Sequence, residues 1–143
     1  MPRRILVPLM LSLLASGTSL SAQTYTCSSA TSDDAVNVRD YMIRLVTATT
    51  DTSLVETRKA YRLPAVDSSK VSIVTNAKTC RSAAIAYNKA IHGAHAQAVS
   101  RKIVVVKIGT TRYVLIDPLE RYGEYGINVI TNSSFVVLST FGG

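Results

Sequence analysis

Three acidic side chains gather in one short segment near the C-terminal end of the chain. Asp117, Glu120 and Glu124 lie within eight residues of one another. Paired carboxylates can act as general acid and general base, or bind calcium through their oxygens. Their spacing differs from the acidic loop that wraps calcium between two helices, so we expect no metal ion here.

Two arginines close to these acids can neutralise them, Arg121 within the segment and Arg112 before it. A solvated loop is therefore the simpler interpretation. The loop 117–125 is still the best candidate for a binding or catalytic site, because two tyrosines stand beside the acids. That candidate site comprises Asp117, Glu120, Arg121, Tyr122, Glu124 and Tyr125.

Other patterns that carry chemistry are weaker. His92 and His95 are three residues apart and would share one side of a continuous helix, which suits a bound metal. Gly93 weakens that helix and no third ligand is near in sequence, so we expect two solvated histidines, no metal and no cofactor. No serine lies in the Gly-x-Ser-x-Gly turn that presents a nucleophile.

The first 22 residues have the order of a secretory signal peptide. Arg3 and Arg4 precede an apolar run over residues 5–15, and small or polar residues follow up to Ala22. The apolar run is shorter than the roughly 20 residues that span a bilayer. We expect cleavage after Ala22, general secretion rather than twin-arginine export, and no membrane anchor afterwards. Residues 23–143 then form a single domain in the periplasm or the medium.

Cleavage would also lower the basic charge of the protein. The chain has 16 Lys and Arg against 9 Asp and Glu, a net charge of +7, and losing Arg3 and Arg4 leaves 14 against 9, or +5. The remaining positive residues are interpreted as dispersed, with no basic run interleaved with aromatic residues. Solvation of the surface explains them better than a polyanionic partner, and we expect no nucleic acid to bind.

Cys27 and Cys80 are the two cysteines of the chain, and both follow the leader. An even, minimal count in an exported protein indicates one disulfide, whereas a metal or redox pair would favour C-x-x-C spacing. Closing a loop of about 54 residues removes chain entropy worth roughly 4 kcal/mol in the usual model. The bond would tie the N-terminal tail to the body of the domain.

Three helices are expected in the first half of the mature chain. The first begins at the cap Ser32, the second at Ser53 in a capping box with Glu56, and the third at Asn76 with a stop at Gly93. Apolar residues recur at intervals of three and four, as on one face of a helix. The buried stripes are Ala35, Val38, Met42 and Leu45 or Val46 in the first helix, and Cys80, Ala83 or Ala84, Tyr87 and Ile91 in the third.

The second half changes to the short, β-branched segments that are typical of strands. Gly109 supplies the unusual dihedral of a tight turn in the first of two hairpins, and Asn132 begins the turn of the second. The expected strands are 71–74, 102–108, 112–117, 125–131 and 134–141.

Helices followed by strands predict an α+β domain, with the N-terminal helices packed on one face of a C-terminal antiparallel sheet of three to four strands. Residues 103–106 are apolar without alternation. That strand is therefore expected to be central or covered on both sides, the alternatives being an exposed edge or a partner on the open face.

Three C-terminal segments resemble small exported bacterial proteins of unknown function: Val-Val-Lys-Ile-Gly at 105–109, Tyr-Val-Leu-Ile-Asp-Pro at 113–118 and Gly-Glu-Tyr at 123–125. The resemblance covers about the last 40 residues. Helices followed by a sheet are also similar, at a coarse level, to cystatin-like and other small secreted α+β binding modules. The Gln-x-Val-x-Gly signature of cystatin inhibitors is absent, which argues against protease inhibition.

These observations favour an exported, non-enzymatic binding or interaction module. Its sheet face or its hairpin loops would contact another exported or envelope protein. The alternative is a small periplasmic hydrolase or ligand-binding enzyme that uses the acidic loop 117–125.

Overall fold

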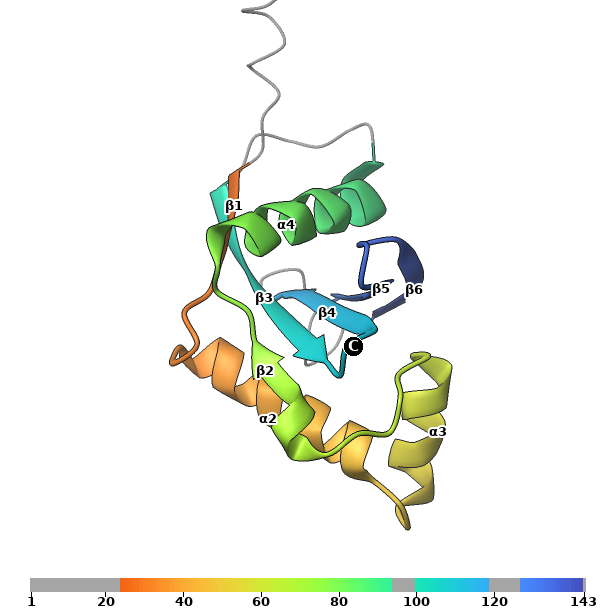
Figure 1. The fold of residues 1–143 in the computed structure, drawn as a ribbon. Coiled ribbons are helices and arrows are strands. Elements are labelled where there is room, and N and C mark those ends of the chain that lie inside the picture. Colours follow the sequence, from red (N-terminus) through yellow and green to blue (C-terminus); the bar gives the residue numbers. More distant parts are fainter. Residues whose placement is uncertain (1–23, 94–99, 119–126, 143) are drawn as a thin grey trace, which may run out of the picture.

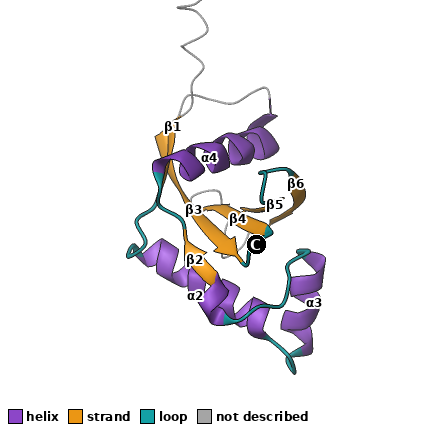
Figure 2. Cartoon of the chain, in the orientation of Figure 1, coloured by secondary structure: helices purple, strands orange, loops and turns teal. Residues whose placement is uncertain are grey.

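The chain folds into helices on both sides of a mixed sheet (Figures 1 and 2). The computed structural model describes residues 24–93, 100–118 and 127–142, so the expected leader lies outside it. The elements in chain order are β1 (Thr24–Cys27), α2 (Asp33–Thr47), α3 (Thr52–Ala60), the 3₁₀ turn η3 (Ser68–Lys70), β2 (Val71–Ile73), α4 (Ala77–His92), β3 (Ser100–Ile108), β4 (Arg112–Asp117), β5 (Ile127–Asn132) and β6 (Val137–Gly142).

The α+β class is confirmed, and the helices precede the main sheet as expected. The described residues form six strands rather than three or four, in the order β1-β3-β4-β5-β6 with β2 also on β3. Both expected hairpins are present, because β3 pairs antiparallel with β4, and β5 pairs antiparallel with β6. Antiparallel pairing of β4 with β5 joins the two hairpins. The sheet is mixed because β1 runs parallel to β3.

Two short strands share one edge of β3. Residues 24–27 of β1 pair with 100–103, and residues 71–73 of β2 pair with 106–108. Backbone bonds close the junction between them, because the N–H groups of Ser28 and Val74 donate to the carbonyls of Ile103 and Val105, each at 2.8 Å. One long strand is thus completed by two distant segments of the chain.

Both faces of β3 are buried, which corrects the expectation that the helices pack on one face. Val104, Val106 and Ile108 enter one core with α2, while Ile103 and Val105 enter a second core with α4. Side chains alternate across a strand, so the two cores lie on opposite faces of the sheet. Figure 1 shows α2 and α4 on either side of β3 and β4. A sheet covered twice needs continuous apolar strands, which explains the missing alternation at 103–106.

The α2 helix follows its predicted pattern. The Ser32 hydroxyl accepts a hydrogen bond from the Ala35 N–H at 3.1 Å, and Asp33 and Asp34 occupy the first turn, where the helix dipole favours negative charge. The buried residues are Ala35, Val38, Met42, Leu45 and Val46.

The α4 helix covers the second face. Asn76 caps its start by accepting from the Thr79 N–H at 2.9 Å, and Gly93 ends it with φ +59°. Cys80, Ala83, Ala84 and Tyr87 of its predicted stripe are buried, with Tyr87 and Ala83 fully enclosed, while Ile91 is only partly buried. Both signals for the ends of the helix are confirmed.

The predicted start of α3 is wrong by two residues. Asp51, not Ser53, is the cap, because its carboxylate accepts from the Leu54 N–H at 3.2 Å. The C-terminal end closes with backbone bonds from Arg62 to Lys59 and from Leu63 to Arg58, with Arg62 at φ +60°. None of the residues of α3 is fully buried, although Leu54 packs against the first core and Tyr61 and Leu63 after the helix belong to it.

The expected disulfide is confirmed. Cys27 at the end of β1 is bonded to Cys80 in α4, with their Cα atoms 5.7 Å apart and a sequence separation of 53 residues. The bond therefore fastens the parallel edge strand to the helix that covers the second core. Cys80 is buried against that core, so the bond is also part of its packing.

The double variant Cys27→Ala/Cys80→Ala is expected to lose about 2–5 kcal/mol of unfolding free energy, because the unfolded chain regains the entropy of an open loop. Urea unfolding followed by circular dichroism measures the loss. Reduced wild-type protein is the matched control and should unfold like the double variant. Equal stability of oxidised, reduced and substituted protein would show that the bond does not hold β1 to the domain.

Candidate functional site

The acidic loop is represented in the structure by its first residue. Asp117 ends β4, pairs with Ile127 across the sheet and is 0% exposed. The expectation of a solvated side chain is therefore wrong for Asp117, because the end of β4 is buried. The other members of the candidate site, Glu120, Arg121, Tyr122, Glu124 and Tyr125, lie outside the described residues, so the site as a whole stays a prediction.

The histidine pair is also divided. His92 is the last residue of α4, and His95 lies outside the described residues. Within 24–93, 100–118 and 127–142, no three His, Cys, Asp or Glu side chains are grouped as metal ligands. Over the same residues, no helix has the length and apolar character needed to cross a membrane.

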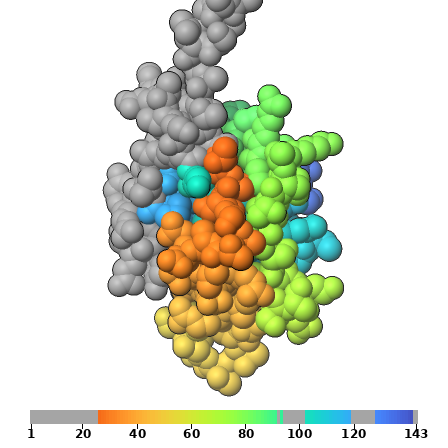
Figure 3. Space-filling model, turned by 90° about the vertical axis from the view of Figure 1, so that its left-hand side faces the viewer, coloured from red at the N-terminus to blue at the C-terminus, as the bar shows by residue number. Residues whose placement is uncertain are grey.

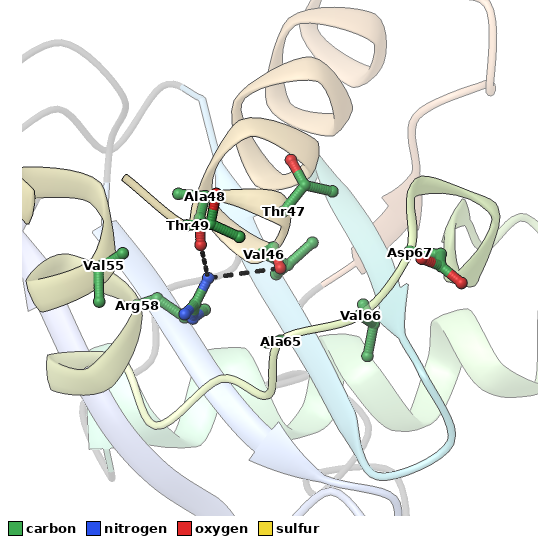
Figure 4. Close-up of a pocket in the computed structure, with 9 residues that line it drawn as sticks. All are labelled: Val46, Thr47, Ala48, Thr49, Val55, Arg58, Ala65, Val66 and Asp67. Carbon is green, nitrogen blue, oxygen red and sulfur yellow. Dashed lines mark hydrogen bonds between the residues drawn. The ribbon is translucent and has the colours of Figure 1, made fainter. Parts of the chain in front are cut away.

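A hollow of about 610 Å³ lies between the end of α2, α3 and the segment before η3 (Figure 4). Its volume falls within the range of small-molecule sites, but it is open to solvent rather than enclosed. In Figure 4, Arg58 and Asp67 stand at opposite ends, so they do not form an acid–base pair. The lining residues are Val46, Thr47, Ala48, Thr49, Val55, Arg58, Ala65, Val66 and Asp67.

Arg58 in this hollow closes the C-terminal end of α2. Its Nη1 atom donates to the carbonyls of Leu45, Val46 and Ala48 at 3.2, 3.5 and 2.7 Å. These carbonyls belong to the last turn, where a helix lacks internal partners and carries partial negative charge. Arg58 therefore joins α3 to α2. The hollow is mainly the space around this structural contact.

A buried polar cluster attaches the other end of α3 to the sheet. The Asn128 side-chain nitrogen donates to the Tyr61 hydroxyl at 3.4 Å, and the Tyr61 ring stacks on Phe141 of β6 with centroids 4.3 Å apart. Burial raises the pKa of Tyr61 above its ordinary value of 10.0, opposed by hydrogen bonds from Asn128 and Tyr41. The cluster packs the end of α3 against β5 and β6.

The strand β6 forms the edge of the sheet away from β1 and β2. It carries no charged side chain, and the whole stretch 125–143 has none. Val136 and Val137 at its start are 57% and 39% exposed. Natural edge strands are commonly protected by charge, proline or short length, so an uncharged edge with exposed valines is an unprotected one.

The pairing shows which backbone groups of this edge face outward. The Asn132 N–H donates to the Val136 carbonyl, and Ile130 and Asn128 pair with Ser139 and Phe141. Because neighbouring residues of a strand direct their backbone groups to opposite sides, Thr140 directs its N–H and C=O away from β5.

Part of the β6 edge is engaged from within the protein. Arg62 Nη1 donates to the Leu138 carbonyl at 3.5 Å, and Ser139 Oγ donates to the Tyr61 carbonyl at 3.4 Å. A bulge between β5 and β6 bends the strand at the same place. The end of α3 thus protects the first half of β6, and the unprotected edge is the half that contains Thr140.

Replacing Arg58 by Met is expected to lower the unfolding free energy by about 1–3 kcal/mol, because charge-assisted bonds to the end of α2 are lost while the apolar stem remains. Lys59→Met is the matched control, since Lys59 has only an exposed ion pair with Glu56 at 3.9 Å and should change stability by less than about 0.5 kcal/mol. Chemical unfolding measures both. Equal losses of unfolding free energy in both variants would show that Arg58 does not hold α3 to α2.

The Tyr61→Phe variant tests the buried cluster through pH. A raised pKa means that the folded state favours the protonated Tyr61 hydroxyl. This preference stabilises the fold below pH 10, and the stabilisation is lost as pH rises through the folded-state pKa. Tyr61→Phe should be less stable than wild type near neutral pH, because the Asn128 side chain loses its hydrogen-bond partner. Phenylalanine does not titrate, so the variant should not lose stability in this way at alkaline pH. The stability gap between wild type and variant should therefore narrow above pH 10 in unfolding curves. A gap independent of pH would show that Tyr61 is not desolvated.

Comparisons with known proteins assign neither these residues nor the fold to a family. No protein-family model, no curated protein and no solved structure matches the chain. The function is therefore argued from the surfaces and contacts of this chain alone.

Proposed function

We propose that the protein is an exported, non-enzymatic interaction module that binds an extended segment of another exported or envelope protein along β6. The observation that carries the proposal is the uncharged, unprotected edge around Thr140 with the exposed Val136 and Val137 beside it. A peptide that adds a strand gains backbone hydrogen bonds from such an edge and side-chain contacts from alternate positions. The disulfide Cys27–Cys80 is compatible with an oxidising compartment.

The arrangement of layers supports the edge over the sheet face. Packing of α2 and α4 covers both faces of the central strands, so the face considered in the sequence analysis is occupied by the protein itself. The opposite edge consists of two short strands of four and three residues, joined end to end on β3. The β6 edge and the turn before it are what the sheet still offers to a partner.

The test introduces lysines at the edge. Val136→Lys/Thr140→Lys should abolish capture of the partner, because a charge on an edge strand opposes further pairing. Ser69→Lys/Thr75→Lys adds the same charge at exposed positions away from β6 and should leave capture unchanged. Binding is measured first by co-purification from the exported fraction and then between the purified proteins, with hydrogen exchange read at the Thr140 amide.

A purified partner should slow exchange at Thr140 in the wild type and in the Ser69/Thr75 control. A partner that binds all three proteins equally would place the interface elsewhere and contradict the proposal. A strictly monomeric protein without a partner would also contradict it. So would a dimer that the Val136/Thr140 substitutions dissociate, since the edge would then bind a second copy.

A further inference from the structure

The excess of positive charge falls in one stretch of the sequence. Residues 33–67 hold six Asp and Glu against five Lys and Arg, whereas residues 68–116 hold eight Lys and Arg and no acid. The basic residues are still dispersed along this stretch, but no acidic residue offsets them. In Figure 3 its first part, through α4, is seen as a continuous green strip.

Three of these cations form a row on the outer side of α4. Lys78, Arg81 and Lys89 are exposed and, with Ile85, lie within an arc of about 80° at 100° per residue. The arc is opposite the buried stripe that contains Tyr87 and Ala83. We call these four residues, Lys78, Arg81, Ile85 and Lys89, the α4 outer face.

The helix dipole favours Lys89, in the last turn of α4, but opposes Lys78 at its start. The first turn of α4 has no acidic residue and contains Lys78, with Arg81 one turn later. In contrast, α2 has two aspartates in its first turn and Arg44 in its last. Positive charge near the start of a helix is unfavourable. Within the part of the chain that the structure describes, the ion pair is Lys59–Glu56, and it involves none of the α4 cations. The helix dipole therefore does not account for Lys78 and Arg81.

An apolar side chain lies in the middle of the row. Ile85 is 63% exposed, more than any other large hydrophobic residue that the structure describes, and Arg81 and Lys89 are four residues before and after it. Cations alone suffice to bind a polyanion through its charged backbone. A helix surface that combines lysine and arginine with an exposed aliphatic residue fits the boundary of a bilayer, where the cations meet head groups and the apolar residue enters the acyl region.

We propose that the α4 outer face binds the surface of an anionic lipid bilayer, with Ile85 inserted between head groups. The row from Lys78 to Lys89 is about 16 Å long, enough to contact several head groups. This contact is peripheral and reversible, and it is separate from the β6 edge proposed to bind protein. It would hold the module at a membrane while β6 stays available.

The test is sedimentation of the protein, as processed by the producing cell, with vesicles of phosphatidylglycerol and phosphatidylcholine. Wild type should bind these vesicles at low salt, bind pure phosphatidylcholine much less, and dissociate at high salt. Lys78→Gln/Arg81→Gln/Lys89→Gln should lower the partition coefficient by about tenfold or more. Ile85→Ser should lower it several-fold without changing the charge.

The matched control removes three cations from the other layer, as Arg39→Gln/Arg44→Gln/Lys59→Gln, and should retain binding within about twofold. If both triple variants lost vesicle binding equally, binding would depend only on net charge, and the proposal would be overturned. Retention on heparin without vesicle binding would also overturn it, in favour of an anionic polymer. Thermal unfolding of every variant establishes that it is folded, and failure of the β6 test leaves this outcome unaffected.

Discussion

The burial of β3 on both faces is the constraint on which the rest of the structure depends. Ile103, Val104, Val105 and Val106 are all fully enclosed, so successive side chains must enter different cores. Each core then requires its own cover, which α2 supplies on one side and α4 on the other. Apolar residues of β4 and β5 continue both layers, because Leu115 and Val129 pair in one core while Val114 and Ile130 pair in the other. The layer order leaves edges and outer helix surfaces for contact with other molecules.

Elements away from β3 are held by different physics. The four-residue strand β1 is fastened by the covalent bond from Cys27 to α4. The helix α3 has no fully buried residue and is held by Arg58 at α2 and by Tyr61 at the sheet. Hydrophobic burial thus sets the position of the central layers, while a disulfide and oriented hydrogen bonds position the periphery. Such attachments are directional, so they fix where α3 lies over the start of β6.

Signals that act over a few residues predicted much of this fold. Caps at Ser32 and Asn76, the stop at Gly93, the hairpin at Gly109 and the disulfide follow from local chemistry or from a count of two cysteines. The parallel strand β1 could not be predicted, because its partner is about 76 residues away and pairing energy comes from burial against β3. Both Asp and Ser are favourable N-cap residues, so the sequence does not choose between Asp51 and Ser53. The position of the first helical turn makes Asp51 the cap of α3.

Prediction of a site from the sequence had less physical basis than prediction of the fold. It rested on residue types, whereas packing decides which of those residues are exposed. Asp117 has the chemistry of a surface acid but ends a buried strand. The absence of charge after Glu124 and of acid between Asp67 and Asp117 is readable in the sequence, yet it acquires meaning only once β6 is known to be an edge and α4 to expose one side.

Local rules are broken at several places, and three of them bear on contacts at the surface. Arg62 adopts a left-handed conformation that favours glycine, Lys78 stands at the positive end of a helix, and β6 lacks the charge that protects an edge. In a chain that is consistent elsewhere, such departures concentrate where a contact outside the fold compensates for them. Arg62 already has an internal compensation, since its strained turn brings its guanidinium to the Leu138 carbonyl. Lys78 and the Thr140 half of β6 have none within the described residues, and they are therefore the positions where an external partner gains most.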